Sequence, residues 1–218
     1  MMEEELLSWY EPLKKRLEKH NGDAIIIMRH AERHPISDPA QHRHAMLTEK
    51  GRESSLELGA WLREQEILPS SCLTSPVQRC WETAKLILEG ASLELDIKTI
   101  PHLGSITPFI QDVEMAEMTF RLMHMQEICN GLLTGEPVPG FTDMGSGLRP
   151  LIEILCTNTE EGIALVVTHD FFVASIAGYA LQMSFRGDEW IHFLEPMLLL
   201  NDGGRLTAWF RGNEALVP

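Results

Sequence analysis

The chain has 218 residues, a length that fits one large α/β domain or two small ones, and 44% of them are hydrophobic, which is enough for a full core. Its formal net charge of −14 at pH 7, with no uninterrupted basic run to offset it, disfavours a nucleic-acid partner or an anionic membrane. The acidic start and the lack of any apolar run near the ~20 residues that a bilayer requires predict a cytoplasmic protein without a membrane segment.

The first half of the chain alternates helical and strand patterns. Apolar residues at spacings of three and four indicate an amphipathic first helix, and the apolar run 25–28 indicates a strand that is buried on both faces. Thr48 is the expected N-cap of the next helix, in which Gly51 permits close packing near the first strand. The elements expected here are helices over residues 6–20, 49–65 and 77–88, strands over residues 24–28, 71–74 and 93–100, and a polar loop over residues 30–46.

The second half begins with a segment that we interpret as a small lid or cap, covering about residues 101–147. Its Gly/Pro-rich flanks enclose one predicted helix, residues 112–133. A second fully apolar strand, residues 162–167, again ends in polar residues. The other elements expected here are helices over residues 148–156 and 171–183 and strands over residues 197–200 and 206–210, joined by a turn.

The order of these elements predicts an α/β fold. We expect a three-layer sandwich in which a mostly parallel central sheet has helices on both faces. The chain shows no internal repeat and no clear domain linker, so residues 1–218 are interpreted as a single domain with the small lid inserted in it. The last two strands are expected to form a hairpin at one edge of the sheet.

Polar side chains follow three of the predicted strands at the point where each strand ends. They are Arg29, His30 and Arg33 after the first strand, Arg79 just past the second, and His169 with Asp170 after the late one. Right-handed crossovers bring the carboxyl ends of parallel neighbours to the same edge of a sheet. The sequence therefore predicts that these side chains share one pocket.

The chemistry of this set favours a phosphoryl group. Arginine donates parallel hydrogen bonds from a planar group that stays charged, so Arg29, Arg33 and Arg79 can hold a tetrahedral dianion. The same cations disfavour the imidazolium form of His30 and are expected to lower its pKa. A neutral ring nitrogen of His30 is then free to attack phosphorus, and no metal or other cofactor is required.

The late strand supplies the groups that complete the reaction. A protonated His169 could stabilise the charge that spreads over the phosphoryl oxygens during transfer. The leaving alkoxide needs a proton, which Asp170 could supply before taking one from the hydrolytic water. Asp170 could also cap the helix that follows the strand, and the two roles are compatible.

At this point the residues resemble those of the histidine phosphatase superfamily, whose phosphatase and phosphoglycerate mutase members share an Arg-His-x-x-Arg start. The matching segments are, in the order and at the spacing of the family, residues 29–33 (RHAER), 47–51 (LTEKG), 75–84 (SPVQRCWETA) and 166–170 (VVTHD). The resemblance covers roughly residues 25–177. It implies that His30 is the phosphorylated nucleophile, that Arg29, Arg33 and Arg79 bind the phosphate, and that His169 is the second histidine of the pocket.

Two features depart from the commonest pattern of the family. Ala31 stands where glycine is usual, a small change if the backbone torsions there are ordinary. An aspartate directly after the second histidine is similar to the acid-phosphatase and phytase branch, whereas the mutase-like branch uses an upstream glutamate as general acid, so Glu114 and Glu117 are the reserve candidates. The chain lacks the secretion signal, the disulfides and the large inserted domain of the acid-phosphatase and phytase branch. It therefore resembles a compact phosphatase with a His-Asp dipeptide.

The leading hypothesis is a metal-independent phosphatase that hydrolyses a phosphomonoester through a phosphohistidine, on a phosphorylated small molecule or a phosphoprotein. Two alternatives stay open: phosphoryl transfer of the phosphoglycerate mutase type, and a non-catalytic phosphate- or phosphoprotein-binding protein on the same scaffold. For His34, His42 and His44, solvated or substrate-facing loop histidines are a better interpretation than a zinc site, since no HExxH motif or cysteine pair accompanies them.

Overall fold

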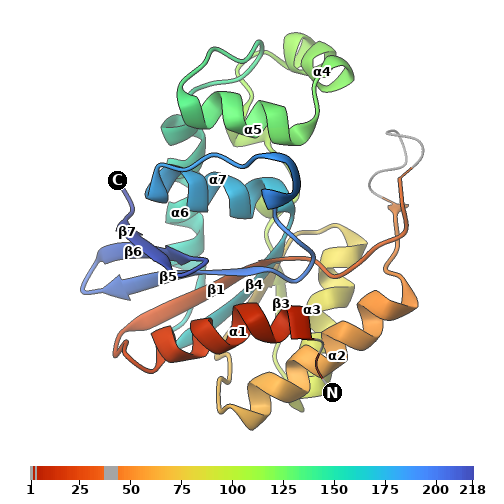
Figure 1. The fold of residues 1–218 in the computed structure, drawn as a ribbon, viewed down its shortest axis with the longest axis vertical. Helices are drawn as coiled ribbons and strands as arrows, with labels where there is room; N and C mark the ends of the chain where they lie inside the picture. Colours follow the sequence, from red (N-terminus) through yellow and green to blue (C-terminus); the bar gives the residue numbers. More distant parts are fainter. Residues whose placement is uncertain (1, 3, 37–43) are drawn as a thin grey trace.

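Strand β1 (Asp23–Arg29) is the buried apolar strand expected after the first helix, and it lies inside a seven-stranded sheet (Figure 1). The computed structural model describes residue 2, residues 4–36 and residues 44–218. β1 pairs in parallel with β4 (Ile163–Thr168) and antiparallel with β5 (Pro196–Asp202). The strand order across the sheet is β3-β2-β4-β1-β5-β6-β7.

The sheet has a parallel half and an antiparallel half. In the parallel half, β2 (Ser71–Thr74) pairs with both β4 and β3 (Ile97–Thr99). In the antiparallel half, β5, β6 (Arg205–Phe210) and β7 (Asn213–Leu216) follow one another as a meander. The predicted α/β fold with a mostly parallel core is therefore confirmed, as is the hairpin near the end of the chain.

Two strands differ from the sequence-based expectation. β3 covers three residues instead of residues 93–100, because it lies at the edge of the sheet and its partner β2 is only four residues long. β7 was not predicted, because its sequence, NEAL, has no apolar run. It forms by pairing with the free edge of β6 after a turn at Arg211 and Gly212, whose φ values are 49° and 79°.

Helices cover both faces of the sheet, as a three-layer sandwich requires. Successive side chains of a strand point to opposite faces, so Ile25 and Ile27 of β1 enter one core cluster and Ile26 and Met28 the other. The cluster around Ile26 includes residues of α1 (Glu4–Leu17), α2 (Glu49–Glu64) and α3 (Gln78–Ala91), and the cluster around Ile27 includes residues of α5 (Met125–Thr134), α6 (Met144–Asn158) and α7 (Asp170–Leu181).

The single helix expected over residues 112–133 is wrong, and two helices replace it: α4 (Val113–Leu122) and α5. Met123 and His124 have extended backbone torsions and separate the two. The backbone N–H of His124 donates to a carboxylate oxygen of Glu127 at 2.7 Å, which stabilises the start of α5. Helical periodicity runs through this junction, so only the local capping contact reveals it.

Side-chain caps set where two other helices begin. Thr48 caps α2 as predicted, because its hydroxyl accepts a hydrogen bond from the N–H of Gly51 at 3.0 Å. α6 begins four residues earlier than the expected residue 148, because Asp143 accepts a hydrogen bond from the N–H of Ser146 at 2.9 Å.

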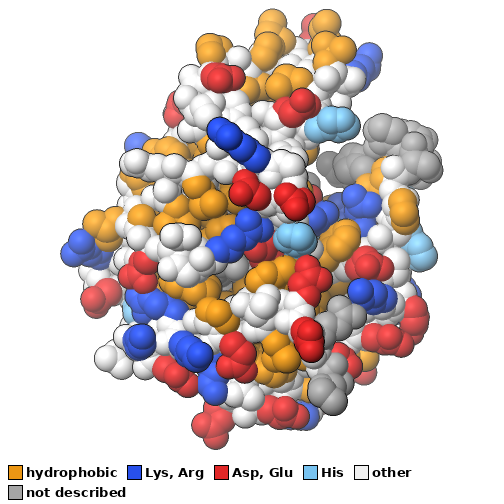
Figure 2. All heavy atoms as spheres, in the orientation of Figure 1, with side chains coloured by type: hydrophobic (Ala, Val, Ile, Leu, Met, Phe, Trp, Pro, Cys, Tyr) orange, Lys and Arg blue, Asp and Glu red, His pale blue; other side chains and the backbone are white. Residues whose placement is uncertain are grey.

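The segment that contains α4 and α5 forms the end of the molecule farthest from α2, at the top of Figure 1. Hydrophobic side chains gather on the surface of α4 (Figure 2), among them Val113, Met118 and Leu122, which are 64%, 61% and 81% exposed. Within the described ranges, no helix is long and apolar enough to cross a membrane.

Helices α2 and α3 approach each other through two glycines. A Cβ atom added at Gly59 would lie 2.0 Å from the carbonyl oxygen of Ile87, and one added at Gly90 would lie 2.1 Å from that of Leu56. These neighbours are backbone atoms of a packed helix, so they cannot yield as a flexible side chain would. The two helices can therefore pack this closely only because glycine has no side chain at positions 59 and 90.

We expect Gly59→Ala to destabilise the fold. Alanine favours an isolated helix by about 1 kcal/mol over glycine, whereas overpacking at this contact should cost about 1–3 kcal/mol and more where backbone atoms clash. Urea denaturation should show a lower free energy of unfolding for Gly59→Ala than for the wild type. The exposed Glu53→Ala on the same helix is the control and should change little, and a Gly59→Ala variant of unchanged or higher stability would contradict this packing.

Candidate active site

The carboxyl end of β1 places His30 at the centre of the sheet edge. The backbone N–H of His30 donates to the carbonyl of Thr168, the last residue of β4, at 2.9 Å. The N–H of the next residue, Ala31, donates to the hydroxyl of Thr83 on α3 at 3.1 Å. Gly51 lies against this turn, because a Cβ on it would be 2.2 Å from the carbonyl oxygen of Glu32. The close packing predicted for Gly51 is thus confirmed, and three elements hold the His30 backbone.

The strand ends bring the predicted side chains together. Arg79, in the first turn of α3 after β2, donates from Nε to Nε2 of His30 at 2.8 Å, and its Nη2 lies 3.2 Å from Nδ1 of His169. Asp170 Oδ2 lies 3.1 Å from Nη2 of Arg29. The rings of His30 and His169 meet edge to face, with centroids 5.5 Å apart.

The hydrogen bonds of His30 define its tautomer. A guanidinium only donates, so Nε2 of His30 must accept the bond from Arg79 and carries no proton. The carbonyl oxygen of Ala31 only accepts, and it lies 2.7 Å from Nδ1 of His30, so Nδ1 carries the proton. His30 is therefore a neutral imidazole whose Nε2 lone pair points at Arg79.

The surroundings of His30 keep its ring neutral. Its side chain is 2% exposed, and this burial is the main cause that lowers its pKa well below 6.5. His169, Arg79 and Arg29 lower it further, while the hydrogen bond to Ala31 raises it. The pKa shift expected from the sequence thus has the predicted sign, with desolvation as the largest contribution.

The ring of His169 contacts Arg79, Ser75 and Cys80 in the same pocket. Because Arg79 donates to its Nδ1, the proton of the ring lies on Nε2, which donates to the hydroxyl of Ser75 at 3.0 Å. The sulfur of Cys80 lies 3.6 Å from Nε2. A protonated His169, as expected from the sequence, requires Arg79 to move away from Nδ1.

The guanidinium of Arg29 is fixed on two sides. Its Nη1 donates to the carbonyl of Ile191 at 2.5 Å and its Nη2 pairs with Asp170. The ring of Phe193 stacks on it, with 4.1 Å between Cζ and the ring centroid. Its Nε is buried and has no hydrogen-bond partner among the described residues.

The three arginines make the pocket electropositive. Burial lowers the pKa of Arg29, Arg33 and Arg79, and the charges of Arg79 and Arg29 lower that of Arg33 further. Arg33 is half-buried and donates to the carbonyl of His34 at 2.9 Å. Asp170 compensates part of this charge, and the carboxylate of Glu195 also raises the pKa of Arg29. An anion bound here would further relieve the mutual repulsion of the three cations.

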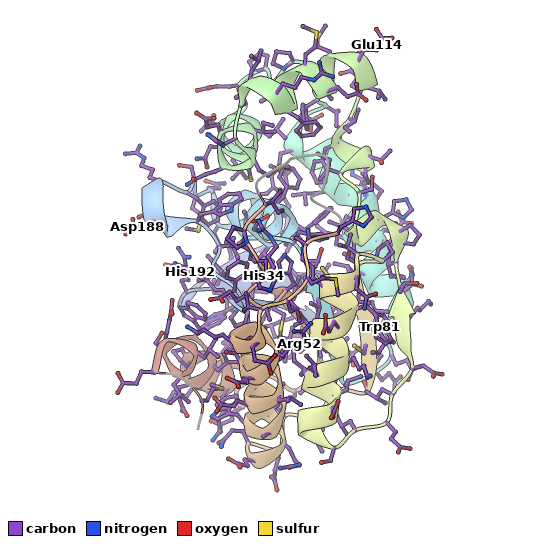
Figure 3. The ribbon with its side chains drawn as sticks, turned by 90° about the vertical axis from the view of Figure 1, so that its right-hand side faces the viewer. His34, Arg52, Trp81, Glu114, Asp188 and His192 are labelled. Atoms are coloured by element: carbon purple, nitrogen blue, oxygen red, sulfur yellow. The ribbon has the colours of Figure 1, made fainter. Side chains whose placement is uncertain are left out.

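Asp170 is the first residue of α7, and His169 occupies the N-cap position. Its Oδ1 accepts a hydrogen bond from the N–H of Phe171 at 2.9 Å, and its side chain is 26% exposed. The negative charge of Asp170 therefore interacts favourably with the dipole at the N-terminus of α7, and the same side chain borders the pocket. Glu114, by contrast, lies on α4 at the top of Figure 3, whereas His34 lies near the middle of the molecule.

Two of the three loop histidines, His34 and His44, lie within the residues that the structure describes and belong to no cluster of metal-ligating side chains there. His34 and His44 are exposed, and His42 lies outside the described residues. Over residues 4–36 and 44–218, no group of three or more His, Cys, Asp and Glu side chains could hold a metal ion.

Several contacts of the site have no clear signal in the sequence. Ser75 and Thr83 stand within a segment that resembles the superfamily, but their bonds to His169 and Ala31 depend on the packing of α3 against the sheet. Phe193, whose ring centroid is 5.7 Å from that of His30, belongs to no pattern. It comes from the loop that precedes β5 and is brought to the pocket by the antiparallel pairing of β5 with β1.

Comparison with known protein families gives one match that covers most of the chain. The family model described as histidine phosphatase superfamily (branch 1) matches residues 25–196. No curated protein sequence is similar enough to the chain to match it.

Solved structures share the fold at low sequence identity. A phosphoglycerate mutase from Bacillus anthracis has a TM-score of 0.57 and 16% identity, with 92% of this chain and 94% of that chain covered. A mycobacterial glucosyl-3-phosphoglycerate phosphatase has a TM-score of 0.57 and 15% identity, with 85% and 97% covered. A phosphoserine phosphatase mutant from Entamoeba histolytica, in complex with phosphoserine, has a TM-score of 0.52 and 13% identity, with 90% and 95% covered.

The resemblance predicted from four short segments is thereby confirmed over most of the chain. The matching model is that of branch 1, although the His169-Asp170 dipeptide resembles the acid-phosphatase branch. The chain belongs to the histidine phosphatase superfamily.

Proposed function

We propose that the protein is a metal-independent phosphatase that hydrolyses a phosphomonoester through a phosphohistidine on His30. The observation that carries the proposal is the unprotonated, buried Nε2 of His30, held 2.8 Å from Arg79 inside a pocket of three arginines. A neutral imidazole nitrogen is a nucleophile, and guanidinium groups bind the phosphoryl oxygens around it.

The first step transfers the phosphoryl group to the protein. When the phosphate enters, Arg79 exchanges its bond to Nε2 of His30 for bonds to phosphoryl oxygens, which frees the lone pair. Nε2 forms a bond to phosphorus while the bond to the leaving oxygen breaks, and Asp170 donates a proton to that oxygen. The Nδ1–H bond to Ala31 stabilises the positive charge that develops on the ring.

The second step returns the protein to its starting state. A water molecule attacks the phosphorus of phospho-His30, and the carboxylate of Asp170 accepts its proton. The N–P bond breaks, its electron pair returns to Nε2, and inorganic phosphate leaves. The arginines stabilise the equatorial oxygens in both steps, so no metal ion is needed for charge neutralisation.

The substrate is a phosphorylated small molecule or a phosphoprotein in this proposal. The pocket side chains described above account for the phosphoryl group, so the rest of the substrate must be recognised elsewhere. We assign that recognition to the loop 34–46 and to residues 101–147, which would act as a lid. Two of the structural relatives act on phosphorylated small molecules, according to their names, which is compatible with this assignment.

The direct test is phosphate release in the presence of EDTA from a panel of phosphomonoesters. We expect His30→Ala to lower kcat/KM by at least ~10³-fold, because the covalent route is lost. An acid-labile phosphoprotein should be trapped with the wild type and be absent from His30→Ala. His20→Ala, at the other end of β1, is the matched control and should retain activity.

Three results would contradict the proposal. Full activity of His30→Ala would exclude the phosphohistidine, and phosphoryl transfer to a second hydroxyl without phosphate release would indicate a mutase. Phosphate binding with neither reaction would indicate a binding protein.

A second prediction concerns the protonation of His30. Because burial and neighbouring cations lower its pKa, nitrogen NMR between pH 8 and 5 should show a neutral ring with the proton on Nδ1. Unfolding in urea should restore a pKa of about 6.5. Arg79→Gln should raise the folded-state pKa, because one of the lowering charges is removed. A titration of His30 at or above 6.5 in the native protein would contradict the assigned electrostatics.

A third prediction identifies the general acid. Asp170→Asn keeps the shape of the side chain and one acceptor oxygen, which can retain either the bond from Phe171 or the contact with Arg29, and it removes the acid. Turnover of alkyl phosphates should fall by about 10²–10⁴-fold, while phosphoenzyme formation from 4-nitrophenyl phosphate, whose leaving group needs no proton, should fall much less. Glu114→Gln is the control and should retain activity. Equal losses with both substrates would argue against Asp170 as the acid.

A further inference from the structure

The loop Trp190 to Glu195, which we name the support loop, touches both Arg29 and His30. The carbonyl of Ile191 accepts the Nη1 bond of Arg29, and the ring of Phe193 covers its guanidinium. The N–H of Leu194 donates to the backbone carbonyl of Arg29 at 3.1 Å. The side chain and the main chain of Arg29 are therefore both bound to this one loop.

An ion pair fixes the carboxyl end of the support loop. Glu195 is 1% exposed, and its two carboxylate oxygens accept bonds from Nε and Nη2 of Arg211 at 2.6 and 2.9 Å. One of these oxygens also accepts the N–H of His192 at 2.9 Å, and Nη1 of Arg211 donates to the carbonyl of Glu189 at 2.9 Å. A bidentate pair of this kind sets orientation as well as distance. Arg211 thus holds the loop from the turn between β6 and β7.

A tyrosine fixes the middle of the support loop. Tyr10 of α1 is completely buried, and its hydroxyl donates to the carbonyl of Leu194 at 2.8 Å. Burial and the charge of Glu195 raise the pKa of this hydroxyl, so it remains a donor at all ordinary pH values. Leu194 has a φ of 60°, in the left-handed region that is unfavourable for leucine, so the loop conformation requires external contacts.

The two anchors come from parts of the chain that the superfamily match does not include. The match ends at residue 196 and begins at residue 25, whereas Tyr10 precedes it and Arg211 follows it. In Figure 1, α1 lies beside the sheet below β1, and β6 and β7 lie at the end of the sheet beyond β5. In Figure 3, His192 of the support loop lies between Asp188, at the left edge of the molecule, and His34, near its middle.

We propose that Tyr10 and the Glu195–Arg211 ion pair are positioning residues that hold Arg29 in the orientation for phosphate binding. The inference rests on the proposed function, in which Arg29 binds the phosphoryl group. With the support loop in place, the guanidinium of Arg29 keeps its buried Nε–H without a protein partner among the described residues. Without the support loop, the guanidinium of Arg29 would be held by Asp170 alone among the contacts described above. Phosphate binding would then have to immobilise the Arg29 side chain, and the loss of conformational entropy would weaken the affinity.

The test is a double-mutant cycle on the affinity for inorganic phosphate, measured by calorimetry. Tyr10→Phe removes one hydroxyl and keeps the edge contact of the ring with Trp61, and Arg211→Gln removes the ion pair. Each should weaken phosphate binding about tenfold in the wild-type background and leave it unchanged in the Arg29→Ala background. Arg16→Gln is the matched control, because Arg16 also joins α1 to β7 through Glu214 but does not contact the support loop.

The outcomes separate the inference from the proposed function. If Arg29→Ala weakens phosphate binding but Tyr10→Phe and Arg211→Gln do not, the positioning role is overturned while the phosphate site stands. If the two variants lose the same factor with and without Arg29, their effect is a general distortion and the role is again overturned. If Arg29→Ala itself binds phosphate normally, the role of Arg29 in phosphate binding is overturned together with the positioning role, while the phosphohistidine on His30 is still decided by His30→Ala. Circular dichroism melts should accompany each variant, and Glu195→Gln replaces either variant that does not fold.

Discussion

The hydrogen bond from Nε of Arg79 to Nε2 of His30 is the interaction on which the pocket depends. It selects one tautomer of His30 and places a permanent cation 2.8 Å from the nitrogen that we propose as the nucleophile. Through its Nη2 the same guanidinium sets the tautomer of His169. Burying the charge of Arg79 is unfavourable unless negative charge nearby compensates it. Here the compensation is partial, because desolvation still lowers the pKa of Arg79. A phosphate dianion bound in the pocket would supply further negative charge close to Arg79.

The sheet explains how much of this was predictable. The apolar runs that become β1 and β4 are strong signals of buried strands, and polar residues after them mark the carboxyl edge. Strand ends and parallel topology therefore predict that Arg29, His30, Arg79, His169 and Asp170 lie together at one edge of the sheet, as the structure shows. The resemblance to the superfamily adds the roles that we propose for them, because the same residue types stand at the same spacing.

The rest depends on contacts between segments distant in the sequence. Phe193 and Tyr10 meet the pocket through the pairing of β5 with β1 and the packing of α1, and neither leaves a periodic pattern. β7 was missed because its strand character comes from the free edge of β6, and the break between α4 and α5 was missed because one carboxylate outweighs continuous helical periodicity. Local propensity decides an element only where tertiary contacts do not compete.

The contact between Asp170 and Arg29 connects the two roles that we propose for the pocket, phosphate binding and proton transfer. Nη2 of Arg29 lies 3.1 Å from Oδ2 of Asp170, and the same guanidinium would bind phosphoryl oxygens. A phosphate dianion would therefore compete with Asp170 for Arg29 and release Oδ2 from this contact. In the proposed mechanism, the released carboxyl group then serves the leaving oxygen and, in the second step, the water. The bond from the N–H of Phe171 to Oδ1 holds the side chain at the start of α7.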